Sequence, residues 1–184
     1  MIAVIDYGAG NIRSIINGLR RAGAEVKIAE EPGTLKHADA VVLPGVGAFG
    51  DAMEKLAGFK TAISDAVDSG KPLLGLCLGI QVILEESEES PGIEGLGLLR
   101  GGCRRFRGKL KVPHIGWNTV KKTRDTPLLD DIRDGEYFYF VHSYYVEPED
   151  HGAVAAETEY MLSLIHISEP TRLLSISYAV FCLK

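Results

Sequence analysis

Residues 71–87, KPLLGLCLGIQVILEES, constrain the fold more than any other stretch of the chain. Their spacing predicts a short buried strand at 73–74 and a helix at 80–86. Between the two, Cys77 stands in the tight glycine-flanked turn 75–79, which is the sulfur version of the G-x-S-x-G nucleophile elbow. The pattern therefore predicts an α/β sheet with Cys77 at a strand-to-helix turn.

Such a turn would place the Cys77 side chain at the carboxyl edge of the sheet, beside the N-terminus of the following helix. The partial positive charge of that helix end favours thiolate over thiol, which makes Cys77 the candidate nucleophile. Free cysteine is also among the most buried residue types, so a core position for this thiol is the alternative. Packing alone does not require glycine on both sides, and we therefore favour the nucleophile.

Short apolar runs alternate with amphipathic stretches in the first half of the chain, which is typical of a three-layer α/β sandwich with a mostly parallel central sheet. Beyond Gly92, turn-separated runs predict an antiparallel extension of that sheet. The predicted strands are 2–5, 25–29, 40–43, 73–74, 96–99, 103–106, 117–121 and 137–145, and the predicted helices are 11–22, 51–57, 60–68 and 80–86.

Length and composition exclude several classes of protein. The 184 residues suffice for one domain with a proper core, and the net charge of −5 argues against nucleic acid or an anionic membrane as partner. Three cysteines without C-x-x-C spacing argue against a disulfide framework and a structural zinc site. The N-terminus lacks a basic region, and no apolar run approaches about 18 residues. We expect a cytoplasmic protein that uses no metal and no cofactor.

A second glycine-rich segment follows the third predicted strand. Gly45, Gly47 and Gly50 match the G-x-G-x-x-G pattern of dinucleotide-binding folds. That fingerprint normally follows the first strand of its βαβ unit, so the match is weak. We favour another use, in which a peptide N–H at Val46 or Gly47 and the N–H of Leu78 stabilise a tetrahedral oxyanion.

Three other segments have ordinary structural explanations. The aromatic stretch 140–145 is consistent with a half-buried strand. The segment 113–118, which holds the only tryptophan, is consistent with a turn that packs an aromatic ring on the core. The acidic run 85–89 is typical of a solvated helix end.

Together these segments resemble the glutaminase subunits of imidazole glycerol phosphate synthase, a family of class I, triad-type glutamine amidotransferases of histidine biosynthesis. The resemblance covers residues 1–160, and DYGAGN and PHIGWN point to this subunit in particular. The matching segments, in the family's order and spacing, are DYGAGNIRS at 6–14, LPGVGAFGDAM at 43–53, KPLLGLCLGIQ at 71–81, PHIGWN at 113–118 and YFVHSYY at 139–145.

The resemblance implies a chemistry for these positions. Cys77 would attack the side-chain amide of glutamine, and a thioester and ammonia would form. Gln81 matches a position that holds the substrate glutamine. His142, Ser143 and Tyr144 match a segment whose backbone binds the α-groups of that glutamine.

The resemblance also implies a partner. The segment 44–47 matches the family's oxyanion strand, and Asn11 lies in the loop near it at the subunit interface. The partner would be a TIM-barrel cyclase subunit, whose barrel carries the ammonia to the site where the imidazole ring is closed.

The C-terminal part departs from the family. Family members activate the cysteine with a His-Pro-Glu sequence, usually within QFHPEKS, and the 184 residues contain no such sequence. Residues 161–184 match nothing in the family and resemble translated sequencing-adapter or vector sequence. We therefore divide the chain into a truncated amidotransferase domain at 1–160 and a non-family tail at 161–184, which we interpret as a sequencing or assembly artefact.

We expect the tail to pack irregularly, although its apolar runs are able to add a strand or a helix. His166 and Glu169 lack the family spacing, so we expect neither within hydrogen-bond distance of the Cys77 sulfur. Without a base that delivers a proton to the leaving ammonia, this chain is expected not to hydrolyse glutamine. The alternatives are a non-catalytic partner-binding module and another amidotransferase or cysteine hydrolase with the same elbow.

Overall fold

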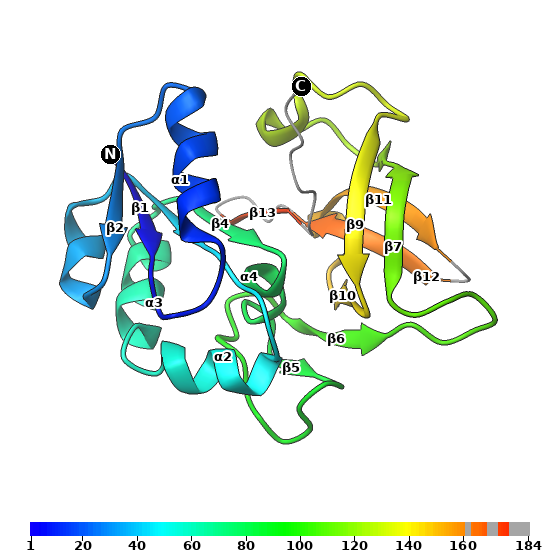
Figure 1. Ribbon diagram of the computed structural model, residues 1–184, viewed down its shortest axis with the longest axis horizontal. Helices are drawn as coiled ribbons and strands as arrows, with labels where there is room; N and C mark the ends of the chain where they lie inside the picture. The colour runs from blue at the N-terminus through cyan, green and yellow to red at the C-terminus, as the bar shows by residue number, and fades with distance from the viewer. Residues whose placement is uncertain (161–162, 169–172, 177–184) are drawn as a thin grey trace.

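The computed structural model describes residues 1–160, 163–168 and 173–176. Two lobes lie side by side in Figure 1, a layered α/β lobe from the N-terminal half and a β-rich lobe from the C-terminal half. None of the helices in this described part of the chain is long and apolar enough to cross a membrane.

The α/β lobe is built on a five-stranded sheet in the order β13-β4-β3-β1-β2, and each neighbouring pair is parallel. This confirms the predicted parallel central sheet. The strands are β1 (Ile2–Ile5), β2 (Val26–Ala29), β3 (Ala40–Leu43), β4 (Leu73–Leu76) and β13 (Leu173–Ile176).

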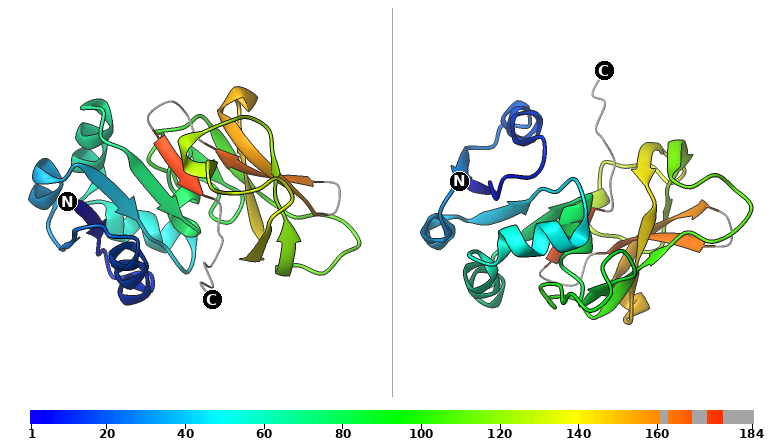
Figure 2. Two further views of the ribbon diagram at one scale, coloured as in Figure 1. Left: turned by 90° about the horizontal axis from the view of Figure 1, so that it is seen from above. Right: turned by 60° about the horizontal axis from the view of Figure 1, so that its bottom comes forward.

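Helices cover both faces of this sheet and complete the predicted three-layer sandwich. Successive side chains of a strand point to opposite faces, so Val4 and Val42 meet Ile16 of α1, whereas Ile5 and Leu43 join the core formed with α2 and α3. Figure 2 shows α1 and α3 on opposite sides of the strands. The helices are α1 (Ile12–Arg21), α2 (Phe49–Leu56), α3 (Lys60–Asp68), α4 (Leu78–Gln81) and the 3-10 helix η1 (Pro32–His37).

The β-rich lobe holds three small sheets in the orders β10-β6-β5, β12-β11-β8 and β7-β9, and among their described pairs only β5–β6 is parallel. The predicted antiparallel strands are therefore present, but in sheets of their own and not as an extension of the central sheet. Phe106, Phe138 and Phe140 are the largest side chains of its core. Its strands are β5 (Glu86–Ser87), β6 (Gly101–Arg105), β7 (His114–Thr119), β8 (Lys121–Lys122), β9 (Tyr137–His142), β10 (Tyr144–Pro148), β11 (Val154–Tyr160) and β12 (Ser163–Ser168).

The helix after Cys77 is shorter than predicted. It ends at Gln81, because the carbonyls of residues 82–84 accept hydrogen bonds from the amides of residues 96–98, at 2.8–3.2 Å, instead of continuing a helix. The side chains of 82–84 are fully buried, and such an uninterrupted apolar run does not reveal its period. The strand predicted at 96–99 is wrong for the same reason, since these residues bond to the end of the elbow helix.

The acidic run 85–89 is not a solvated helix end, so that prediction is also wrong. Glu86 lies in β5, and its carboxylate forms an ion pair with Arg104 at 2.8 Å. The Glu88 carboxylate accepts hydrogen bonds from the backbone N–H of Arg105 and from the Arg107 guanidinium, each at 3.0 Å. These carboxylates join the turn after the elbow to β6.

The described residues of the tail pair regularly rather than irregularly. β12 runs antiparallel to β11, and β13 adds to the edge of the central sheet beside β4. The edge of β4 would otherwise present unpaired N–H and C=O groups, which an apolar segment such as Leu173–Ile176 is able to satisfy. His166 lies in β12 opposite Glu157, and Glu169 lies outside the described residues.

The backbone of the turn after β4 packs directly against the backbone at the end of β3, with no side chain between them. A Cβ on Gly79 would lie 1.9 Å from the carbonyl oxygen of Leu43, and a Cβ on Gly75 would lie 2.8 Å from the backbone nitrogen of Ile80. Real Cβ atoms do not approach other atoms so closely, so packing requires both elbow glycines, and the expectation that packing alone does not require them is wrong.

Gly79→Ala should destabilise the fold, because its methyl group fits only if β3 and the elbow separate. We expect the free energy of unfolding, measured by equilibrium urea denaturation, to fall by about 3 kcal/mol. Gly18→Ala is the matched control, since Gly18 lies within α1 and its added Cβ would meet no atom within 4 Å. That control should gain about 0.5–1 kcal/mol. Unchanged stability of Gly79→Ala would contradict the contact.

Candidate active site

Cys77 occupies a strained turn between β4 and α4. Its backbone dihedrals are φ 56° and ψ −115°, and it is the one non-glycine residue with positive φ among those the structure describes. Such conformations cost on the order of 1–3 kcal/mol and cluster at functional sites. The predicted elbow with unusual dihedrals at Cys77 is confirmed.

Burial keeps the Cys77 thiol protonated. Burial is the largest influence and raises the pKa of Cys77 to about 11, while the N–H of Leu78 lowers this pKa and the Glu89 carboxylate raises it. The N–H of Leu78 at the helix N-terminus acts in the expected direction, but its effect on the pKa is smaller than that of burial. Helix α4 has only four residues, and desolvation of the sulfur outweighs its small dipole.

The segment 44–47 lies directly against the elbow. A Cβ on Gly45 would stand 2.7 Å from the nitrogen of Gly79 and 2.8 Å from Cβ of Leu78. The buried Tyr7 hydroxyl, 2.9 Å from the same Cβ position, donates a hydrogen bond of 2.8 Å to the carbonyl of Pro44. Only glycine fits at position 45, because the elbow and Tyr7 fill the space that a side chain would need.

The three predicted oxyanion donors belong to these two touching segments. The N–H of Leu78 acts on the Cys77 sulfur, and the Leu78 side chain is buried. Beyond Gly45 the chain turns outward, with Val46 51 % exposed and Gly47 at φ +105°. Their role as donors stays a prediction.

The dinucleotide alternative meets an obstacle at the start of α2. The N–H of Phe49 donates to the Glu89 carboxylate at 2.8 Å, and the N–H of Gly50 donates to the Ser90 hydroxyl at 3.0 Å. In a dinucleotide fold the N–H groups at this helix end bind the pyrophosphate. Here they are occupied by side chains, which disfavours nucleotide binding.

Helix α4 connects the elbow to the β-rich lobe. Ile80 packs in one buried cluster with Cys103 of β6 and Val146 of β10. Gln81 lies four residues after Cys77, is buried, and accepts a hydrogen bond of 3.6 Å from the Cys103 thiol on its backbone carbonyl. The elbow helix is thereby tied to β6 and to the middle of β10.

The predicted segment 142–144 forms the turn between β9 and β10. His142 ends β9 and is buried, Ser143 stands between the strands, and Tyr144 begins β10. The Ser143 carbonyl accepts a hydrogen bond of 3.1 Å from the N–H of Phe106. The turn is therefore fixed to the strand that leads out of β6.

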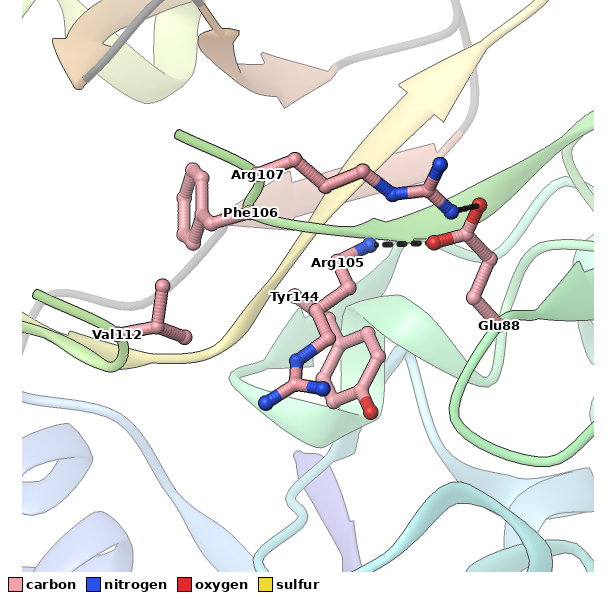
Figure 3. Close-up of a pocket in the computed structure, with 6 residues that line it drawn as sticks. All are labelled: Glu88, Arg105, Phe106, Arg107, Val112 and Tyr144. Atoms are coloured by element: carbon pink, nitrogen blue, oxygen red, sulfur yellow. Dashed lines mark hydrogen bonds and ion pairs between the residues drawn. The ribbon is translucent and has the colours of Figure 1, made fainter. Parts of the chain in front are cut away.

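An open pocket of about 490 Å³ lies at this turn, lined by Tyr144 and by residues of the β6 end (Figure 3). The Arg107 guanidinium points to Glu88 on one side, and Arg105 and Tyr144 lie together on another. No elbow residue lines the pocket, so it borders the candidate site without containing the sulfur. Across the described ranges, no three His, Cys, Asp or Glu side chains gather as a metal site.

Glu89 is the site residue that sequence reasoning missed. Its carboxylate accepts from the N–H of Phe49 and is the one charged side chain that affects the pKa of Cys77. A run of acidic residues does not reveal which carboxylate has a fixed partner. The only feature of the sequence that could have indicated Glu89 was its position shortly after the elbow.

Sequence comparison agrees with this geometry. The family model for class-I glutamine amidotransferase matches residues 3–175. Imidazole glycerol phosphate synthase subunit HisH of Halobacterium salinarum is 54 % identical over 164 residues, which cover 86 % of this chain and 75 % of that protein. The HisH protein of Methanothermobacter thermautotrophicus is 52 % identical over 160 residues, which cover 87 % and 80 % respectively.

The chain belongs to the HisH family of class I glutamine amidotransferases. Solved structures agree at the level of the fold. A glutamine amidotransferase crystal structure superposes with a TM-score of 0.75 at 18 % identity, covering 96 % of this chain and 89 % of that one. PurLQS from Thermotoga maritima superposes with a TM-score of 0.69 at 19 % identity, covering 94 % and 83 %. The chain therefore combines a HisH-type sequence with the fold of a glutamine amidotransferase.

The buried thiol of this HisH-family chain should alkylate slowly. With the pKa of Cys77 at about 11, the thiolate fraction, and with it the rate of iodoacetamide labelling, should rise about tenfold per pH unit from pH 7 to 10 without a plateau. Mass spectrometry of peptides separates Cys77 from Cys103 and Cys182, and Cys77→Ser removes the assigned signal. A plateau below pH 9 would show that the elbow stabilises the thiolate after all.

Proposed function

We propose that this chain is a cytoplasmic glutaminase-type subunit of an imidazole glycerol phosphate synthase, which carries the elbow and the glutamine-binding elements of the reaction but, without a His-Pro-Glu sequence, does not complete it. The observation that carries the proposal is the strained Cys77 elbow in backbone contact with the segment 44–47, in a chain 54 % identical to a HisH protein. A nucleophile beside a strand with outward-turning peptides suits attack on an amide carbonyl.

The reaction has two halves. The Cys77 sulfur attacks the side-chain carbonyl carbon of glutamine. The carbonyl oxygen becomes an oxyanion, which accepts hydrogen bonds from the backbone N–H of Leu78 and from that of Val46 or Gly47. The C–N bond then breaks, the nitrogen leaves as ammonia after taking a proton, and a thioester remains. Water hydrolyses the thioester to glutamate and restores the thiol.

Binding of the rest of the substrate is assigned to three elements. Gln81 on α4 and the backbone of the 142–144 turn hold the glutamine, as the family resemblance implies. Glu89 is placed by the N–H of Phe49, and its negative charge near the sulfur complements the α-ammonium group.

This chain by itself lacks the proton acceptor of that scheme. Burial holds the pKa of Cys77 at about 11, so attack at neutral pH requires a base that takes the thiol proton, and the 184 residues contain no His-Pro-Glu. The same two observations favour a second candidate function for the chain as it stands, which is binding to the cyclase partner without glutamine hydrolysis.

Mixed with a cyclase subunit, the chain should support synthesis from added ammonia but not from glutamine. Loss of the base should lower glutamine-dependent turnover by roughly 10⁴-fold or more. A chimera with residues 161–184 replaced by the C-terminal part of the Halobacterium salinarum protein should regain glutamate release. Cys77→Ala in that chimera should abolish it and leave ammonia-dependent synthesis intact. Full glutamine turnover by the unaltered chain would refute the missing-base proposal.

The β7–β9 ribbon supplies a surface for the partner. Ile115 pairs with Val141 and Trp117 with Tyr139, and the outward residues Ile115, Trp117 and Val141 are 40–57 % exposed. In Figure 1 the ribbon lies in front of β11 and β12. Exposed apolar patches of this kind mark protein interfaces, and Trp is enriched among the residues that dominate binding energy. We assign this face to the cyclase subunit.

Trp117→Ala should weaken the complex with the cyclase subunit by about 2 kcal/mol, or roughly 30-fold in Kd, measured by titration calorimetry. Ile28→Ala serves as the control, because Ile28 is 40 % exposed on β2 in the other lobe. That variant should bind within about twofold of the unaltered chain. Equal affinities of both variants would remove the ribbon from the interface.

A further inference from the structure

Two buried histidines face each other across the β7–β9 ribbon. His114 and His142 are directly opposed in the register of the strands, and their side chains are 4 % and 8 % exposed. Nδ1 of His114 lies 3.3 Å from Nε2 of His142. Burying a polar ring costs free energy unless its nitrogens form hydrogen bonds, so two buried histidines suggest a role besides packing the core.

The hydrogen bonds determine where both protons lie. Nδ1 of His142 is 2.9 Å from the carbonyl oxygen of Tyr144, and a carbonyl only accepts, so Nδ1 of His142 carries the proton. In a neutral ring Nε2 then has a lone pair, and it accepts from Nδ1–H of His114. The result is a directed chain from His114 through His142 to the Tyr144 carbonyl.

The surroundings keep both rings neutral and fix their orientation. Burial lowers the pKa of His114 and lowers the pKa of His142 to about 4, which the neighbouring His114 also depresses and the Tyr144 carbonyl partly offsets. Phe140 and Tyr160 stack on the His114 ring, with centroids at 5.1 Å and 3.8 Å. The described elements packed on the pair thus present aromatic rings to it, including Phe106, edge-on to His142 at 5.1 Å.

The chain of hydrogen bonds ends on the backbone of the 142–144 turn. A carbonyl and the following N–H share one rigid plane, so His142 fixes the Tyr144–Tyr145 peptide by holding the Tyr144 carbonyl. The N–H of Phe106 fixes the preceding peptide in the same way through the Ser143 carbonyl. The two peptide planes after Ser143 are therefore held by the His142 side chain and by the N–H of Phe106.

We propose that His114 and His142 are positioning residues of the glutaminase site, which together hold the 142–144 turn in the shape that binds the α-groups of glutamine. This role rests on the function proposed above. Neither imidazole touches the reacting atoms. Their contribution is to the affinity for glutamine through the order of the turn.

Nitrogen NMR of the full chain labelled with ¹⁵N-histidine tests the hydrogen-bond chain directly. At pH 7 both rings should be neutral, with the proton on Nδ1, and the exposed His37 and His151 serve as internal references. A proton on Nε2 of His142, or an imidazolium form of either ring at this pH, would overturn the proposal.

His114→Phe tests the positioning role, because it keeps an aromatic ring between Phe140 and Tyr160 and removes only the donor. Calorimetric affinity for L-glutamine should fall on the order of tenfold, and amide hydrogen exchange should accelerate at Tyr144 and Tyr145, whose N–H groups belong to the two held peptides. Phe138→Leu is the control, since Phe138 lies in β9 with His142 and its substitution changes the core without removing a hydrogen-bond donor from the histidine pair. It should leave glutamine affinity within about twofold.

The outcomes separate the two proposals. If His114→Phe changes neither exchange in the turn nor glutamine affinity, the pair only packs the core and the positioning role is wrong. If the unaltered chain does not bind glutamine while His114→Phe still accelerates exchange in the turn, the pair does order the turn and the glutaminase function is what fails.

Discussion

The close approach of Gly79 to the carbonyl of Leu43 is the contact on which the candidate site depends. With no side chain between them, the elbow and the end of β3 lie at backbone distance. The segment that follows β3 therefore runs along the elbow, where Gly45 contacts Leu78 and Gly79. The strain at Cys77 persists because packing holds the turn from both sides.

The same packing raises the pKa of the Cys77 thiol. An elbow buried against a sheet takes its sulfur out of water, and a desolvated thiol holds its proton. Positioning of the sulfur and removal of its proton are therefore supplied by different parts of an amidotransferase. The elbow supplies the position, and a base from another segment must supply the proton transfer.

The β7–β9 ribbon illustrates how one alternating strand pair serves two purposes. Residues that point outward, such as Trp117, form the exposed apolar face, whereas His114 and His142 point inward among aromatic rings. The alternation in β9 was expected from the sequence, whereas the expected turn at 113–118 with its tryptophan on the core is wrong, because this segment is the strand β7 and Trp117 is exposed. The hydrogen bond between the two histidines was not expected, because residues 28 positions apart become partners only through the register of the strands.

The sequence by itself determined the order of the elements, the parallel sheet and the elbow, since each rests on local signals. The strand at 40–43 and the helix at 60–68 have their predicted bounds, because both are regular apolar patterns with clear ends. Tertiary structure alone decided the end of α4, the fixed position of Glu89 and the protonation of Cys77. The first two features depend on hydrogen bonds to distant segments, and the third depends on the loss of water around the sulfur. Neighbouring residues in the sequence do not reveal such hydrogen bonds or such burial.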